Sequence, residues 1–227
     1  MFIGHYAASF ALKKVSPRTS LRALLLGVQF VDILFMIFIL FGIERMRLIP
    51  GTTASNSLKL DFMPYTHSLL GTFLWAVGAF VLFRFALLRK SGYENHTRNL
   101  ISFAVAIAVL SHYFFDVPMH LRDLPLAGDD SYKLGLALWN NRIAAVSLEF
   151  FLTLGRFAVY LTASKPGQGF AGKYGMPIFG AALLVICVLQ YIIPPPTTII
   201  ELSSQALASY IGIGLVGGWL DQKRVYS

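Results

Sequence analysis

The chain has 227 residues, of which 56% are hydrophobic, and its mean hydropathy is +0.64. This composition is too apolar for an ordinary soluble domain and predicts an all-α protein that crosses a membrane several times. The formal net charge is +8. We expect the excess of Lys and Arg to lie in loops that face anionic lipid and the cytoplasm, and not to bind nucleic acid. The single cysteine, Cys187, excludes a disulfide within the chain.

The apolar stretches predict one domain, residues 1–227, built as a bundle of about six transmembrane helices. Each stretch is near the ~20 residues that cross ~30 Å of hydrocarbon. The first apolar segment, 2–12, is too short to cross, so we expect a half-inserted or interfacial helix that ends before Pro17. The expected spans are 23–43, 65–88, 100–115, 143–161, 174–193 and 199–220.

The basic residues predict the orientation. If the N-terminus is cytoplasmic, thirteen of the 19 Lys and Arg residues fall on the inner side and six on the outer side. The positive-inside rule therefore favours both termini in the cytoplasm.

Two carboxylates, Asp32 and Glu149, fall in the middle of expected spans. A carboxylate at that depth needs a proton, a cation or a metal as its partner. The structural alternatives are a hydrogen bond between Asp32 and Gln29, and an ion pair between Glu149 and Arg156.

A run of metal-ligand residue types closes the third span. His112 and Asp116 are one helical turn apart, so they share a helix face and form a two-ligand clip for zinc or manganese. His120 follows four residues later, although Pro118 is expected to end the helix before it. Asp123 is then either a further ligand or a carboxylate that orients a histidine.

Two more histidines lie in or beside apolar segments. His67 opens the second span, and His5 lies in the N-terminal helix. If that helix and the first span form an antiparallel pair, His5 and Asp32 rise to a similar depth and can meet. Scattered core histidines are common, but four of them with two mid-span acids and a clip favour a metal site within about residues 1–150.

These residues also carry a family resemblance. The chain resembles the bacterial LexA-binding, inner-membrane-associated metal-dependent hydrolases over about its first 125 residues. The matching pieces are Gly4-His5, Gln29-Phe30-Val31-Asp32, Pro64-Tyr65-Thr66-His67-Ser68-Leu69, Ser111-His112-Tyr113-Phe114-Phe115-Asp116 and His120-Leu121-Arg122-Asp123-Leu124-Pro125. The resemblance implies a metal hydrolase.

A looser resemblance exists to the zinc-dependent phospholipase C and P1 nuclease group, which are soluble helical enzymes acting on phosphoesters. It rests on the order of ligand types along the chain, and the loop lengths differ. The residues that match in order are His5, Asp32, His67, His112, Asp116, His120 and Glu149.

We therefore expect a membrane-embedded hydrolase that acts on a lipid or lipid-linked phosphoester. One or two zinc ions, or manganese, would be held by the seven residues just named, with Asp32 or Glu149 as the general base. Arg122 or Arg45 would neutralise the substrate headgroup. The alternatives are a proton or metal-ion transporter and a non-catalytic membrane assembly protein.

One further segment, from Trp139 to Arg142, stands out before the fourth span. We expect Trp139 to anchor the chain at a membrane interface and one of the two asparagines to cap the helix.

Overall fold

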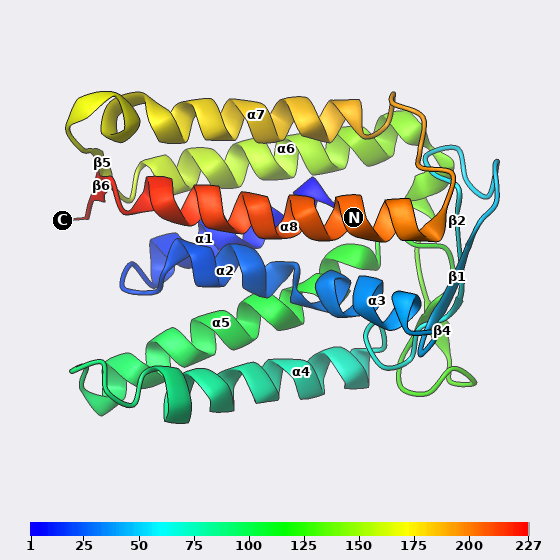
Figure 1. The fold of residues 1–227 in the computed structure, drawn as a ribbon, viewed down its shortest axis with the longest axis horizontal. Coiled ribbons are helices and arrows are strands. Elements are labelled where there is room, and N and C mark those ends of the chain that lie inside the picture. The colour runs from blue at the N-terminus through cyan, green and yellow to red at the C-terminus, as the bar shows by residue number, and fades with distance from the viewer. Residues whose placement is uncertain (227) are drawn as a thin grey trace.

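The computed structural model describes residues 1–226 and is mostly helical, with the long helices lying side by side (Figure 1). Within those residues, five helices are long and apolar enough to cross a membrane, and a sixth span results if one bent pair is counted as a span. The five are α4 (Leu69–Val81) with its π-helical extension η2 (Leu82–Leu87), α5 (Asn95–Asp116), α6 (Arg142–Leu161), α7 (Met176–Leu189) preceded by the π-helical η4 (Ala171–Gly175), and α8 (Ile199–Asp221).

The expected first span is broken. It consists of α2 (Leu21–Val28) and α3 (Phe30–Leu40), which meet at Gln29 with a bend of 50°. The side-chain amide of Gln29 donates a hydrogen bond to the carbonyl of Phe2, 2.9 Å away, so the break is tied to the N-terminal segment. As a result, Asp32 lies in the first turn of α3 rather than in the middle of a continuous helix.

The N-terminal segment is enclosed by the other helices. It forms a short 3-10 turn η1 (Ile3–His5) that leads into α1 (Tyr6–Val15), and Ile3, Tyr6 and Phe10 are fully buried. Its placement in a membrane, half-inserted or interfacial, stays a prediction.

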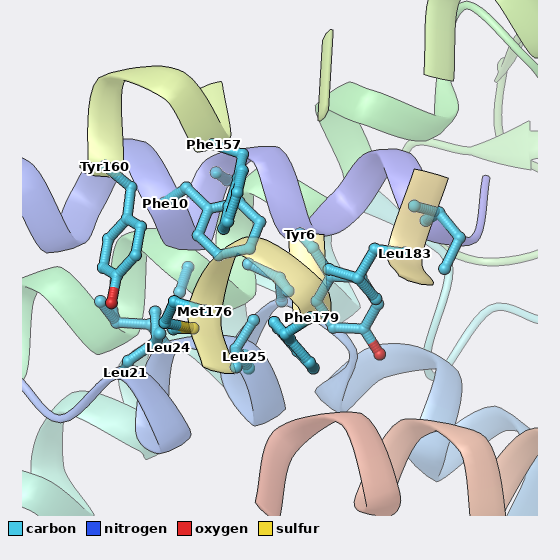
Figure 2. Close-up of a cluster of buried hydrophobic side chains, with 14 of the residues drawn as sticks. Tyr6, Phe10, Leu21, Leu24, Leu25, Phe157, Tyr160, Met176, Phe179 and Leu183 are labelled. Atoms are coloured by element: carbon cyan, nitrogen blue, oxygen red, sulfur yellow. The ribbon is translucent and has the colours of Figure 1, made fainter. Parts of the chain in front are cut away.

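The largest hydrophobic cluster surrounds α1 with side chains from α2, α6 and α7 (Figure 2). Phe10 meets Phe157 of α6 edge to face with ring centroids 5.0 Å apart. Replacing one such buried aromatic residue by alanine typically costs about 3–5 kcal/mol. This packing fixes α1 against the bundle and thereby sets the position of His5 at its start.

Short strands mark the two ends of the bundle (Figure 1). At one end, which we call the hairpin end, β1 (Arg45–Leu48) pairs with β2 (Leu58–Phe62), and β3 (Leu124–Pro125) pairs with β4 (Lys133–Leu134). At the other end, β5 (Lys165–Pro166) pairs with β6 (Arg224–Val225) near the C-terminus. A 3-10 turn, η3 (Leu138–Asn140), leads into α6.

Candidate metal centre

Six of the seven predicted ligands gather at one buried point between the helices. Each is at most 9% exposed to solvent. They come from the N-terminal turn, the first turn of α3, the loop before α4, the last turn of α5 and the loop that follows it. We call them the histidine cluster: His5, Asp32, His67, His112, Asp116 and His120.

Asp116 lies at the centre of this cluster. Its Oδ1 is 3.2 Å from Nε2 of His5 and 2.6 Å from the nitrogen of Met1. Its Oδ2 is 3.1 Å from Nε2 of His112 and 3.6 Å from Nε2 of His120. One carboxylate therefore has imidazole nitrogens against both of its oxygens.

Asp32 supplies the second carboxylate. Its Oδ1 is 3.3 Å from Nε2 of His67 and 3.5 Å from Nε2 of His112. Two groups of three side chains have ligand atoms within 4.8 Å of one another and could each hold a metal ion: His5, His112 and Asp116, and Asp32, His67 and His112.

In two of the histidines, His112 and His120, the other ring nitrogen already makes a hydrogen bond. Nδ1 of His112 lies 2.7 Å from the carbonyl oxygen of Val28, and Nδ1 of His120 lies 3.0 Å from the carboxylate of Asp123. Both partners only accept hydrogen bonds, so both Nδ1 atoms carry a proton. In the neutral rings, Nε2 then presents a lone pair toward the carboxylates.

Two Nε2 atoms have no hydrogen-bond partner at all. Although Nε2 of His112 is 3.1 Å from Asp116 and Nε2 of His5 is 3.2 Å from it, neither contact has hydrogen-bond geometry. The rings of His5 and His112 stack with centroids 3.9 Å apart and an interplanar angle of 8°. The Nε2 lone pair of a neutral His112 ring and the carboxylate oxygens that face it repel, and a cation among them removes the repulsion, so the residues fit a divalent metal.

Glu44 is a buried residue beside the cluster that the sequence did not single out. It is 1% exposed and accepts hydrogen bonds from the backbone of Tyr65, at 2.8 Å, and of Thr66, at 3.0 Å. Its other oxygen accepts the hydroxyl of Thr66 at 2.6 Å, and that hydroxyl lies 2.8 Å from Nδ1 of His67. Because the Thr66 hydroxyl donates its proton to Glu44, it accepts a hydrogen bond from Nδ1 of His67. Nε2 of a neutral His67 ring then carries no proton and can bind a ligand.

The backbone after α5 places His120. The helix ends at Asp116, and the following residues pair with 136–139 through four backbone hydrogen bonds of 2.7–3.1 Å. Gly135 allows this close approach, because a Cβ atom there would lie 1.6 Å from the carbonyl oxygen of Leu121. Asp123 bonds to His120, which is the orienting role expected as one of its two alternatives.

Glu149 lies beside the cluster and is not brought into either three-residue group. Its carboxylate accepts the backbone N–H of Gly4 at 3.0 Å and the hydroxyl of Tyr191 at 2.7 Å. Within residues 1–226 it forms no ion pair with Arg156, and Asp32 forms no hydrogen bond with Gln29. Glu149 therefore fixes the N-terminal turn, and its role as ligand or base stays a prediction.

A cavity of about 170 Å³ opens beside the cluster toward the hairpin end. Asp32, His67, Asp116, His120 and Glu149 reach its wall. The rest of the lining is largely apolar: Phe2, Phe35, Met36, Leu58, Leu60, Trp139 and Tyr210.

The arginines predicted to bind a headgroup do not line this cavity. Arg45 is exposed on β1 above the ring of Phe62, and Arg122 is exposed after α5. Asn141 caps α6 through the backbone N–H of Ala144, as expected for one of the asparagines. Trp139, however, is only 7% exposed and packs on His120 at 4.3 Å, so it is a cavity residue and not a surface anchor.

Comparison with protein-family models, with curated proteins and with solved structures finds no match to this chain. The resemblances noted from the sequence therefore stay predictions.

Proposed function

We propose that this protein is a membrane-embedded, metal-dependent hydrolase that acts on a phosphoester of a lipid or lipid-linked substrate. The observation that carries the proposal is the direction of the imidazoles in the histidine cluster. Their Nε2 atoms converge on two buried carboxylates while three of their Nδ1 atoms are held by other groups. Buried side chains that are left incomplete in this way are typical of a ligand site.

The chemistry of the donors favours zinc. Imidazoles and carboxylates suit zinc and manganese, whereas magnesium prefers oxygen ligands alone. Either three-residue group, His5 with His112 and Asp116, or Asp32 with His67 and His112, would hold such an ion, and His120 faces the same oxygen of Asp116 as His112. An ion held there supplies Lewis acidity and a water that is acidic enough to attack near neutral pH.

Asp32 is placed to act as the base. It lines the cavity, and its Oδ1 faces Nε2 of His67 at 3.3 Å and Nε2 of His112 at 3.5 Å. Glu149, in contrast, accepts four hydrogen bonds, from the backbone of Phe2 and Gly4 and from Gln190 and Tyr191, so its carboxylate is tied to the N-terminal turn and the end of α7. We therefore assign proton removal from the attacking water to Asp32 and the fixing of the N-terminal turn to Glu149.

The membrane setting and the cavity lining support an amphiphilic substrate. The long apolar helices are compatible with a membrane protein, and the cavity joins charged and apolar walls. A phosphoester near an apolar tail would contact both.

The first test is the metal content of the detergent-purified protein by plasma mass spectrometry. We expect about one or two zinc or manganese ions per chain, and none in a His112→Ala, Asp116→Ala double variant. His96→Ala is the matched control, because His96 is exposed at the start of α5 and lies outside the cluster. If the wild-type protein contains no metal even after reloading with zinc or manganese, the proposal is wrong. If it binds metal and conducts ions but does not hydrolyse phosphoesters, a transporter is favoured.

A further inference from the structure

A second pocket adjoins the cavity at the hairpin end. It has a volume of about 400 Å³ and lies between the β1–β2 loop, the start of α6 and the segment after α7. We call it the outer pocket. It shares four lining residues with the cavity of the histidine cluster: Ser55, Asn56, Gln190 and Tyr191.

Arg142 is the only formally charged side chain among the residues that line the outer pocket. Its Nε donates to the carbonyl oxygen of Ala54 at 2.8 Å, which holds the guanidinium against the β1–β2 loop. Within residues 1–226 the terminal nitrogens of this guanidinium have no hydrogen-bond acceptor, so four N–H groups are free to bind a ligand. Arg142 is also the first residue of α6, where the helix dipole favours an anion.

Other donors face the same space. Ser55 is among the residues that line both compartments, and its hydroxyl is buried without a hydrogen-bond partner. Asn56 uses its side-chain oxygen to accept the backbone of Leu58, so its amide nitrogen can donate. No Asp or Glu lines the outer pocket.

We propose that the outer pocket binds a phosphate group of the substrate, held by Arg142, Ser55 and Asn56. A guanidinium pairs with phosphate through two parallel hydrogen bonds, and the tetrahedral anion has oxygens left for the hydroxyl and the amide. This inference rests on the proposed hydrolase function and deepens it, because it places an anionic headgroup next to the bond that is cleaved. Trp139, three residues before Arg142, lines the cavity of the histidine cluster and packs on His120 with ring centroids 4.3 Å apart.

The test is binding of a phosphate ester to the detergent-purified protein, measured by titration calorimetry. The probes are glycerol 3-phosphate, which is soluble, and a short-chain phosphatidylglycerol in micelles, which presents its phosphate on a lipid. Loss of a hydrogen-bonded charge is typically worth about a ten- to hundredfold change in affinity. We expect Arg142→Gln to weaken binding by at least about tenfold and Arg142→Lys to weaken it less, because lysine keeps the charge but not the paired geometry.

Three variants sharpen this test. Arg45→Gln and Arg122→Gln probe the positions that the sequence favoured, and Lys59→Gln removes one charge from an exposed site on β2 at the same end of the molecule. The proposal is supported if the affinity for either probe falls only in the Arg142 variants. Binding of glycerol 3-phosphate would identify a free phosphate as the ligand, and binding of phosphatidylglycerol a lipid-borne one. Three results would overturn the proposal: equal affinity in Arg142→Gln and wild type, an equal loss of affinity in all four glutamine variants, or no binding to wild type.

The two proposals can fail separately. Because none of the histidine cluster lines the outer pocket, phosphate binding should persist in the His112→Ala, Asp116→Ala variant. A wild type that lacks metal but binds phosphate through Arg142 contradicts the hydrolase and keeps the phosphate site. A protein that binds metal, and whose affinity for phosphate does not change when Arg142 is replaced, contradicts the phosphate site and keeps the hydrolase.

Discussion

Two buried polar clusters lie near the two ends of α1, and they differ in how their polar groups are satisfied. The second one, which we call the lysine cluster, joins the end of α1 to α6 and α8 and consists of Lys13, Tyr160, Asp221 and Tyr226. The ammonium of Lys13 has three acceptors: the carbonyls of Pro17 at 2.7 Å and Thr19 at 2.8 Å, and Asp221 at 3.2 Å. Every proton of that group is therefore satisfied.

The carboxylate of Asp221 is completed as well. It accepts the hydroxyls of Tyr160, at 2.8 Å, and of Tyr226. Burial raises the pKa of Tyr226, so this hydroxyl stays protonated and continues to donate. The histidine cluster contains two carboxylates and four imidazoles, yet the Nε2 atoms of His5 and His112 remain without a hydrogen bond.

This difference is the one expected between a structural network and the proposed metal site. A buried charge is costly unless it is paired, and the lysine cluster provides that pairing from its own residues. The histidine cluster does so only in part, as the proposed function expects of a metal site. The contrast predicts that variants of the two clusters affect different quantities: metal binding in one case and stability in the other.

The largest effect should come from the central carboxylates of the two clusters. We expect Asp116→Asn to lower zinc affinity by about a thousandfold, which exceeds the ten- to hundredfold loss typical when a group that only orients a ligand is removed. Asp221→Asn is the matched variant in the lysine cluster and should keep its metal. Metal content after dialysis against a weak chelator measures both, and equal retention by the two variants would contradict the comparison.

The lysine cluster should respond through stability. Lys13→Met leaves Asp221 buried without its cation, and removing one partner of a buried ion pair typically costs about 3–5 kcal/mol. Lys14→Met is the control, since the neighbouring Lys14 is exposed and bonds only to Thr162 at 3.2 Å. We expect the unfolding temperature in detergent to fall much further for the first variant, while both bind metal like wild type.

Added zinc should distinguish the clusters in a third way. A ligand that binds only the folded state at a hundredfold excess over its Kd stabilises it by about 2.7 kcal/mol. Zinc should therefore raise the unfolding temperature of wild type and of Lys13→Met by a similar amount, and leave Asp116→Asn unchanged. A zinc-dependent shift in Asp116→Asn would show that the metal binds elsewhere.

Much of the histidine cluster could be predicted because its residue types are rare in apolar segments. His5, Asp32, His67, His112 and Asp116 stood out by position alone, and the four-residue spacing of the last two placed them on one helix face. The approximate positions of the long helices followed from hydropathy, but their ends did not: α5 begins at Asn95, five residues before the expected start, and the expected first span is broken at Gln29.

What the sequence did not show depends on loops. The bend at Gln29 is set by a bond to Phe2, and the place of His120 is set by backbone pairing with 136–139. Neither has a local signal. The same holds for Glu44, which precedes two exposed arginines and resembles an ordinary surface acid, and for Arg142, whose pocket forms from three distant segments.

The smallest predicted effect concerns Glu44 and tests how Nε2 of His67 is kept free of a proton. In Glu44→Gln the new amide cannot accept from both Thr66 groups, so the Thr66 hydroxyl is free to turn and donate to Nδ1 of His67. The proton of that ring then moves to Nε2, which can no longer bind a metal. We expect about a tenfold weaker zinc affinity, within the range for losing a group that orients a ligand.

Two further variants show whether the Thr66 hydroxyl is the connection. Thr66→Ser keeps the hydroxyl and should bind zinc like wild type, whereas Thr66→Val should match Glu44→Gln. Glu94→Gln, at an exposed acid before α5, controls for the loss of a negative charge. If Thr66→Val binds zinc as tightly as wild type while Glu44→Gln does not, Glu44 acts by holding the backbone of 65–66, and the tautomer of His67 must be set by the metal itself.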